Sequence, residues 1–578
     1  MHLIDWTVMF TILFAIVGFG IYKTREIKNS QSYFVGNKDL KWWTIGLSVM
    51  ATQASAITFL STPGQAFDDG MRFAQFYIGL PIAMVILCIW VLPKFYKSNV
   101  VTAYEYLENR FDLKTRTLTS VLFLIQRGLA AGLTIFAPSI ILSSILGWNL
   151  QLTTIIIGII VIIYTVLGGA VAVSQTQKQQ MIVILSGMFI AFLVIVNKLP
   201  GDISLGNSLD IAGKMGKLNV IDWKWDLTNK YNVWSGILAG TFLFLSYFGT
   251  DQSQVQRYLS GKSLNESRLG LLFNGIFKVP MQIGILLVGI MVFMFYQFNP
   301  APLHFNNANV ELIKESNYAE EFASLEREHE QAMEGKKAAI YALDNAIKTD
   351  GSVEQAQGKV MQYLADEKVR KEAVSDIIKL MNEEDESIKL EKEDTDYVFI
   401  TFIINNLPTG LIGLLLAVIL AAAMSSTSAE LNALATSTVS DIYRRRFAPD
   451  KDDQHYLRAA KWTTAAWGLL ALFFASFASL FDNLIEAVNI IGSLFYGVIL
   501  GVFAVGFFFK RIKGNAIFIA AIIGEFIVLL LFYLQLNGII DLAYLWLNAI
   551  GCLIVIFIAI ILNDVLGDGE KREVELVE

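Results

Sequence analysis

Apolar runs long enough to cross a membrane recur along the whole 578-residue chain. A helix of about 20 apolar residues spans a hydrocarbon core of roughly 30 Å. The pattern predicts an all-α membrane protein with thirteen membrane helices. We expect these helices at residues 4–22, 42–60, 73–93, 118–146, 151–171, 180–198, 233–256, 271–297, 398–440, 459–481, 484–509, 515–535 and 541–562. The run 398–440 is too long for one crossing, so we expect it to extend beyond the bilayer.

One polar segment, residues 298–396, separates two apolar parts of the chain. It is rich in Glu, Lys, Ala and Gln and poor in aromatics, which predicts a solvated antiparallel helical hairpin outside the membrane. Two interpretations stay open. The segment is either a neutral insertion with no role in transport or a docking arm for an unknown partner in the cell envelope.

Lys and Arg gather in alternate short loops, which the positive-inside rule places in the cytoplasm. These basic loops include Lys94, Lys97, Arg110, Arg444, Arg445, Arg446, Lys510, Arg511 and Lys513. Arg72 is the exception in the loops between them. The pattern predicts a multi-pass cell-membrane protein with its N-terminus outside and its C-terminus in the cytoplasm. The net charge of −7 gives no sign of a nucleic-acid partner.

Polar residues interrupt two of the apolar runs near their middles. The second run carries Thr52, Gln53, Ser55 and Thr58, and the run five spans later reads LSYFGTDQSQVQR from residue 245. Interrupted spans at matching places in two halves are typical of inverted-repeat transporters. Unwound backbone there frees carbonyl oxygens for a cation, and helix starts can face an anion. Two polar-tolerant helices buried in protein are the alternative.

A face of small residues runs along the predicted helix over 415–432. Ala422, Ser425, Ser426 and Ala429 lie three or four positions apart and therefore share one side of this helix. A hard cation such as sodium prefers oxygen ligands, and this face offers two hydroxyls beside small side chains. The other interpretation is a helix-packing seam whose hydroxyls bond back to the preceding turn.

Arg127 stands inside the apolar run from Val121 to Leu146. An arginine at this depth costs several kcal/mol or more unless it faces a partner or a wet cavity. A guanidinium binds a carboxylate through two parallel hydrogen bonds, which favours an acidic solute. An internal ion pair with Asp251 and snorkelling to the cytoplasmic edge are the alternatives.

The chain resembles the sodium/solute symporter family over all thirteen predicted spans, the 298–396 segment excepted. The stretches that carry the resemblance are WWTIGLSVMATQASAITF, LGGAVAVSQTQ, GTDQSQVQRYLSGKS, LPTGLIGLLLAVILAAAMSSTSAELN and LGVFAVGFFFKR. It implies a LeuT-like core of two inverted five-helix repeats with broken first and sixth core helices, and transport driven by sodium. The implied sodium ligands are the carbonyls of Ala51, Ala54 and Ala422 and the hydroxyls of Ser425 and Ser426.

The same resemblance gives a domain order along the chain. The order is an extra helix and cytoplasmic loop (1–41), core helices 1–5 (42–198), an external loop (199–232), core helices 6–7 (233–297), the external insertion (298–396), core helices 8–10 (397–509), two peripheral helices (510–562) and a cytoplasmic tail (563–578).

The candidate solute residues come from a resemblance to the sialic acid branch of that family. Its solute-facing positions match Ser55, Thr58, Gln75 and Arg127, and Gln53 matches more weakly. Asp251 and Asn489 complete the candidate set. Tyr77 and Ser253 stand where the sugar-carrying branch has a glutamate and an aromatic gate, which argues against a neutral hexose.

These residues predict a sodium-coupled symporter for a small organic anion, with N-acetylneuraminate as the leading solute. A sodium/sugar or sodium/inositol symporter is the alternative, and a membrane sensor built on a transporter core is the rival from another class. An enzyme lacks support, because no nucleophile with a base, metal cluster or phosphate loop stands out. Gln177 replaces the aspartate of a second sodium site in some members, so we expect one sodium per solute. Glu430 is either a compensating carboxylate or a buried structural acid.

Overall fold

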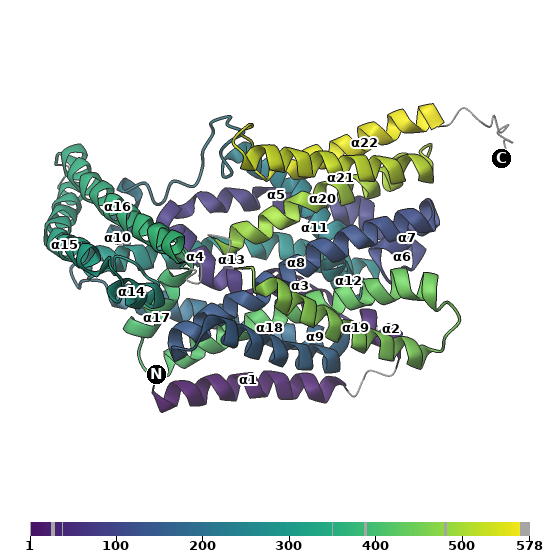
Figure 1. The fold of residues 1–578 in the computed structure, drawn as a ribbon, viewed down its shortest axis with the longest axis horizontal. Coiled ribbons are helices and arrows are strands. Elements are labelled where there is room, and N and C mark those ends of the chain that lie inside the picture. Colours follow the sequence, from purple (N-terminus) through teal and green to yellow (C-terminus); the bar gives the residue numbers. More distant parts are fainter. Residues whose placement is uncertain are drawn as a thin grey trace.

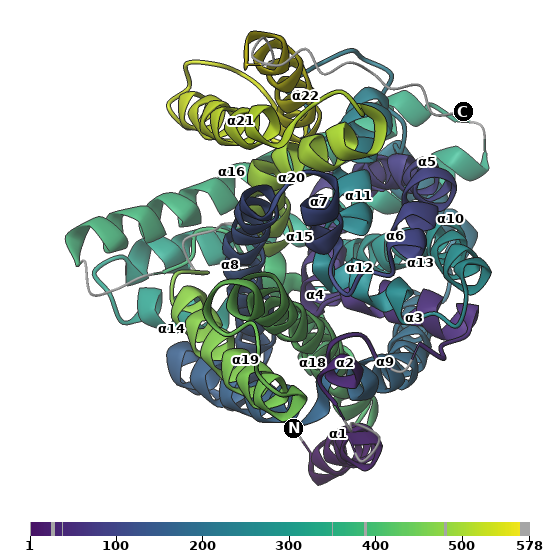
Figure 2. The same cartoon turned by 90° about the vertical axis from the view of Figure 1, so that its right-hand side faces the viewer.

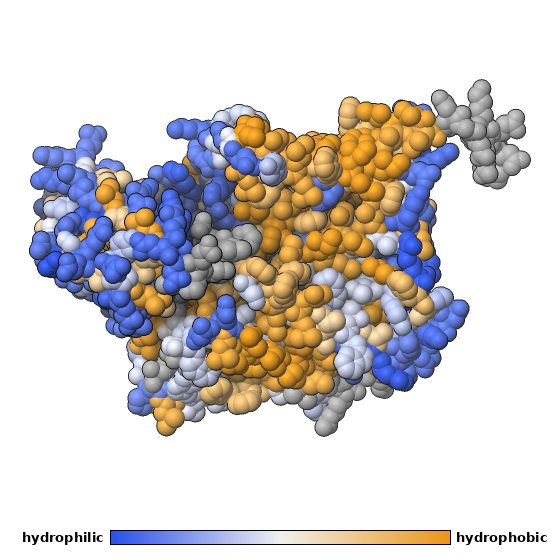
Figure 3. All heavy atoms as spheres, viewed as in Figure 1, coloured by the Kyte–Doolittle hydropathy of each residue, from blue (hydrophilic) through white to orange (hydrophobic). Residues whose placement is uncertain are grey.

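The computed structural model describes residues 2–24, 29–36, 38–349, 351–385, 390–478 and 483–566. This part of the chain is built of helices, as the apolar pattern predicts (Figure 1). Ten helical segments are long and apolar enough to cross a membrane. On the face seen in Figure 3, an apolar band covers the bundle between two polar ends. The chain is therefore a multi-pass membrane protein.

The helices correspond to all thirteen predicted spans. The membrane part consists of α1 (Leu3–Thr24), α3 (Trp42–Gln53), α4 (Ala56–Asp69), η1 (Gly70–Ile78), α5 (Gly79–Ile86), η2 (Leu87–Val91), α6 (Leu92–Ser98), α8 (Leu113–Leu146), α9 (Leu150–Asn197), η3 (Ser235–Ala239), α11 (Gly240–Gly249), α12 (Gln252–Leu259), α13 (Leu264–Phe298), α17 (Val398–Asn406), α18 (Leu411–Ser437), η5 (Thr438–Phe447), α19 (Asp453–Ala475), α20 (Leu484–Phe508), α21 (Gly514–Leu536) and α22 (Trp546–Leu566). Shorter elements between them are α2 (Ser30–Val35), α7 (Ala103–Arg110), α10 (Leu205–Lys214) and η4 (Thr395–Tyr397).

The peripheral helices lie at the edges of the bundle. Figure 2 shows α1 and the α21–α22 pair at opposite sides, with α3, α8, α12 and α18 between them. α9 contains two spans because the chain kinks at Gly169, where φ is 51° and ψ is −171°. The predicted tail 563–578 lies outside the described residues from position 567 onward.

Both predicted helix breaks are present. α3 ends at Gln53, its C-cap residue Ala54 has φ −83° and ψ 77°, and α4 begins directly after Ser55. α11 ends at Gly249, and the Asp251 carboxylate accepts the backbone N–H of Ser253 to cap the start of α12. Extended backbone at these positions interrupts the helical hydrogen bonds in the middle of the bundle.

The expectation of one long helix over 398–440 is wrong. The segment divides into α17 and α18, and the chain turns between them through Pro408 and Gly410. Gly410 has a φ of 90°, a conformation that favours glycine, and the following proline-free run continues as α18. α18 therefore starts near the membrane boundary and carries the small-residue face through the centre of the bundle.

The insertion forms the predicted hairpin. It contains α14 (Asn307–Lys314), α15 (Ala319–Lys348) and α16 (Val353–Glu384), and the last two pack along each other at one polar end of the molecule (Figure 1). The hairpin joins the bundle at the C-terminal end of α4. There the Thr395 hydroxyl donates to Asp68 (2.8 Å), and a Cβ added to Gly64 would lie 1.9 Å from the Thr395 carbonyl oxygen. The segment that follows the hairpin thus packs directly on one half of a broken helix.

Candidate functional site

The five predicted sodium ligands lie on two elements that pack against each other, Ala51 and Ala54 at the end of α3 and Ala422, Ser425 and Ser426 on α18. All five residues are buried. The Ser425 hydroxyl donates across the interface to the Ala51 carbonyl (3.3 Å). The Ser426 hydroxyl instead donates within its own helix, to the carbonyls of Ala422 (3.1 Å) and Ala423 (3.3 Å). The packing interpretation therefore describes Ser426 in this state, whereas Ser425 already faces the unwound end of α3.

Gln177 links three helices beside this face. Its Oε1 accepts from the Ser48 hydroxyl (2.5 Å), and its Nε2 donates to the Thr52 hydroxyl (3.0 Å) and the Ser425 carbonyl (3.3 Å). An amide N–H pair here supplies the partial positive charge that these oxygens require. The expected loss of a second sodium site agrees with this arrangement and stays a prediction.

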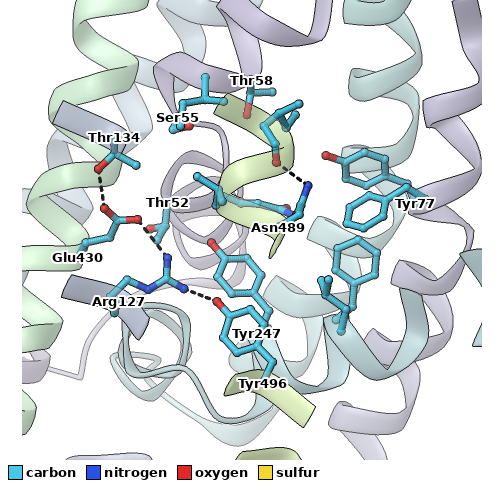
Figure 4. Close-up of a pocket in the computed structure, with 17 residues that line it drawn as sticks. Thr52, Ser55, Thr58, Tyr77, Arg127, Thr134, Tyr247, Glu430, Asn489 and Tyr496 are labelled. Carbon is cyan, nitrogen blue, oxygen red and sulfur yellow. Dashed lines mark hydrogen bonds and ion pairs between the residues drawn. The ribbon is translucent and has the colours of Figure 1, made fainter. Parts of the chain in front are cut away.

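A cavity opens next to the break between α3 and α4 (Figure 4). Its lining includes five of the predicted solute residues: Gln53, Ser55, Thr58, Arg127 and Asn489. The Asn489 amide donates to the Ile485 carbonyl of its own helix (2.8 Å). The remaining wall is mostly apolar and aromatic, as is usual for small-molecule sites. These residues come from four different helices, so the cavity exists only in the folded bundle.

The N-terminal end of α4 faces this cavity, and its N-cap side chain does not cap it. Ser55 is the N-cap residue, but its side chain makes no capping hydrogen bond. Ser55, Ile57 and Thr58 all line the cavity. The first N–H groups of a helix and its dipole favour a negative group. The start of α12 differs, because Asp251 caps it.

Gln75 does not line the cavity, contrary to what the family resemblance implies. Its Nε2 donates to the Tyr231 carbonyl (3.0 Å), and its Oε1 accepts from the Asp222 backbone N–H (2.8 Å). The amide thus fastens the loop over 199–232 to η1. The next two residues, Phe76 and Tyr77, line the cavity in its place.

Arg127 lies between two carboxylates at the base of the cavity. It pairs with Asp251 at the start of α12 and, through Nη1, with Glu430 of α18 (3.1 Å). The same guanidinium donates to the Tyr496 hydroxyl of α20 (2.5 Å). Thr134 donates to the second oxygen of Glu430 (2.8 Å; Figure 4). Arg127 is therefore an internal ion-pair residue in this state and does not snorkel.

The model of one protein family matches most of the chain. That family is the sodium:solute symporter family, and the match covers residues 33–321 and 377–524. The chain belongs to this family. The gap inside the match, between residues 321 and 377, falls within the hairpin. Membership confirms the family resemblance of the sequence and the assignment to transporters rather than enzymes.

Individual family members match with different coverage. Sodium-coupled monocarboxylate transporter 2 of Mus musculus is 31% identical over 271 residues, which are 46% of this chain and 43% of that protein. The chain thus spans under half the length of this relative. Sodium/sialic acid symporter SiaT of Proteus mirabilis is 25% identical over 536 residues, 91% of this chain and 89% of that protein.

One solved structure shares the fold over the whole chain. It is a Na+-coupled sialic acid symporter in a substrate-bound, outward-open state, with 22% sequence identity and a TM-score of 0.74 over 98% of both chains. This likeness confirms the symporter fold that the sequence predicts.

Several cavity residues outside the predicted solute set carry polar groups, among them Thr134, Tyr247 and Tyr496. Tyr247 lies beside the guanidinium of Arg127, with its ring centre 5.3 Å from that group. Glu430 stands four residues after Ser426 on the same helix, and this spacing is the one signal that placed it near the site. Tyr496 gave no such signal, because α20 approaches Arg127 only through tertiary packing.

Proposed function

We propose that this chain is a sodium-coupled symporter that imports a small organic anion, with N-acetylneuraminate as the leading solute. Family membership and the match to a sialic acid symporter over nine-tenths of both chains support it. The observation that carries the sodium part is the contact between the Ser425 hydroxyl and the Ala51 carbonyl beside the cavity.

Sodium would bind the carbonyl oxygens of Ala51, Ala54 and Ala422 and the hydroxyls of Ser425 and Ser426. Such binding holds the end of α3 against α18 and favours the states in which these helices touch. Sodium then changes solute affinity only through the difference between states, and the effect is reciprocal. Because Gln177 places a neutral amide beside this site where some relatives have an aspartate, we propose one sodium per solute.

The acidic group of the solute would bind at the start of α4. Ser55 and Thr58 offer hydroxyl donors there, and the uncapped helix start adds backbone N–H groups. Gln53 and Asn489 lie on the cavity wall and would orient the polar body of the solute. Arg127 and Asp251 would fix the base of the cavity, since each already has an ionic partner.

A sodium/sugar or sodium/inositol symporter is the second candidate. The observation that favours it is the pairing of Arg127 with two carboxylates, because this cluster has no positive charge left for an acid. Hydroxyls and amides on the cavity wall also suit a polyol. The two candidates share the sodium site and differ in the charge of the solute.

We further propose the orientation that the basic loops predict. The N-terminus and the hairpin would face outward, and the C-terminus would lie in the cytoplasm. α1 begins at the end of the bundle that carries the hairpin, and α22 ends at the opposite one (Figure 1). An envelope partner for the hairpin stays a prediction, and crosslinking cells with and without residues 319–384 tests it.

The decisive experiment is uptake of radiolabelled N-acetylneuraminate into proteoliposomes under an inward sodium gradient. We expect saturable uptake that disappears when potassium replaces sodium. Unlabelled acid should compete, and neutral sugars or inositol should not. Sodium-dependent uptake of a neutral polyol without uptake of any acid would contradict the anion proposal and leave the sodium proposal standing. Uptake of the acid independent of sodium would contradict the sodium proposal and leave the anion proposal standing.

A further inference from the structure

A second buried arginine, Arg257, lies on α12. Its side chain is fully buried, yet its hydrogen bonds go only to neutral groups. Nη1 donates to the Ser174 hydroxyl of α9 (3.1 Å), and Nε donates to the Ser253 carbonyl (3.4 Å). Nη2 has no partner among the described residues. No carboxylate in the described part of the chain lies within ion-pair distance of this guanidinium.

An arginine without an anion is costly at such a place. Burying a guanidinium away from water costs several kcal/mol unless a counter-charge and hydrogen bonds replace its hydration. Arg127 meets this requirement with two carboxylates, whereas Arg257 has none among the described residues. Lys278 of α13 is also fully buried without a partner there, but Arg257 lies on α12 directly after the second helix break.

The surroundings place Arg257 beyond the sodium site, toward the basic loops. α12 packs against α3 and α18. The neighbouring Gln256 donates to Asn432 of α18, which stands six residues after Ser426. Six helical residues rise about 9 Å, so this layer lies about one and a half turns below the sodium face. The bond to Ser174 crosses from α12 to α9, and it breaks if these two helices separate.

We propose that Arg257 is an anion-binding site on the inner release path, which takes the carboxylate of the solute after it leaves the cavity. The identity of the anion as the solute rests on the proposed function. Separation of α9 from α12 would free Nη1 from Ser174 and present two guanidinium nitrogens to the opening. An inorganic anion such as chloride offers similar chemistry, and the experiment distinguishes it from the solute.

The test labels a cysteine placed beside Arg257. Ser174→Cys is made with Cys88→Ala and Cys552→Ala, which remove the two buried native thiols. Inside-out vesicles receive anionic 2-sulfonatoethyl or cationic 2-trimethylammonioethyl methanethiosulfonate, with rates normalised to free cysteine. A nearby fixed positive charge should favour the anionic reagent by roughly tenfold. Arg257→Gln should abolish the preference, and Arg257→Lys should retain it.

A protection experiment identifies which anion binds at Arg257. N-acetylneuraminate should slow labelling of Ser174→Cys, and its uncharged methyl ester should not. Equal protection by the same concentration of chloride would overturn the assignment to the solute. No labelling from the inside, or a reagent preference that Arg257→Gln leaves unchanged, would overturn the site itself. Ser174→Cys in the background without native cysteines already reports the preference while Arg257 is intact, so the proposal can still be tested if Arg257→Gln fails to fold.

This experiment is independent of uptake. Reagent preference with no transport of N-acetylneuraminate would contradict the proposed solute and keep the anion site. Normal sodium-driven uptake without any reagent preference would contradict the anion site and keep the proposed function.

Discussion

Two polar clusters beside the cavity satisfy their polar groups in opposite ways. The contact between α3 and α18, here called the neutral wall, offers carbonyl and hydroxyl oxygens from Ala51, Ser425 and neighbouring small residues. The opposite wall is ionic, with Arg127 held between Asp251 and Glu430. Carbonyl and hydroxyl oxygens can accept a cation, whereas the charges of Arg127, Asp251 and Glu430 are already paired with one another. Under the proposed function, sodium would bind and leave at the first wall, whereas the ion pairs of the second link α8, α12 and α18.

Glu430 connects the two walls. It stands one helical turn after Ser426, so α18 carries both the predicted sodium hydroxyls and one carboxylate of the ion cluster. A shift of α18 that follows sodium binding would therefore also strain the pairs of Arg127. This shared helix is a physical route by which the neutral wall can influence the ionic one.

The largest expected effect comes from removing the centre of the ionic wall. Arg127→Ala leaves two buried carboxylates without a counter-charge, and we expect a loss of about 3–5 kcal/mol in stability together with loss of solute uptake. Fluorescence-detected size-exclusion chromatography after heating measures the first effect, and proteoliposome uptake measures the second.

A charge-neutral variant is the control for this prediction. Arg127→Met combined with Asp251→Asn and Glu430→Gln removes all three charges together, and it should recover most of the thermal stability. If Arg127→Ala alone is as stable as the parent, the ion pairs of the ionic wall do not stabilise the packing of α8, α12 and α18.

Ser425→Ala tests the neutral wall, with a smaller effect on the fold. Loss of one hydroxyl ligand should raise the sodium concentration for half-maximal uptake roughly tenfold, while stability falls by only about 1 kcal/mol. Ser428→Ala is the matched control, because its hydroxyl bonds within α18 to the Ser425 carbonyl (3.1 Å). Equal sodium dependence in both variants and the parent would remove Ser425 from the site.

The neutral wall could be predicted from the sequence and the ionic wall only in part. Helix spacing alone puts Ser425 and Ser426 on one face, and the polar interruption around Ser55 marks the break of α3. Arg127 was a clear candidate, but its partners are 124 and 303 residues away in the sequence. Spacing along one helix carries no information on such pairs.

Gln75 shows a second limit of sequence reasoning. It lies in η1, a 3-10 helix, where three residues make one turn instead of 3.6. Side-chain directions therefore differ from those of an α-helix after a few residues. Phe76 and Tyr77 reach the cavity, and Gln75 turns toward the external loop. The sequence predicted the correct segment but the wrong side of it.

Gln177→Asp adds a negative charge to the neutral wall. A carboxylate beside Ser48 and the Ser425 carbonyl should attract a second cation in place of the amide N–H groups. We expect the Hill coefficient for sodium to rise from about 1 toward about 2. Gln177→Asn keeps the wall neutral and serves as the control. An unchanged coefficient in Gln177→Asp would show that the missing aspartate does not set the sodium number.

We expect the smallest effect on transport from changing an ion cluster in the hairpin. Its charges are the reverse of those in the Arg127 cluster, where one cation faces two carboxylates. In the hairpin one carboxylate, Glu367, faces two lysines, with Lys336 at 2.8 Å and Lys371 nearby. Burial acts to raise the pKa of Glu367, but the two lysines outweigh it and lower the pKa from 4.5 to about 2. The ionised form therefore stabilises the hairpin above about pH 4.5, and this contribution is lost as the pH falls toward 2. Hydrogen exchange of residues 319–384 should accelerate over that range in the parent, and Glu367→Gln should abolish the pH dependence at a cost of at most about 3 kcal/mol.

Sodium-driven uptake at neutral pH should stay unchanged in Glu367→Gln, because this charge cluster lies outside the cavity walls. A shifted sodium dependence would instead show that the hairpin acts on α4, to which it is joined through Asp68.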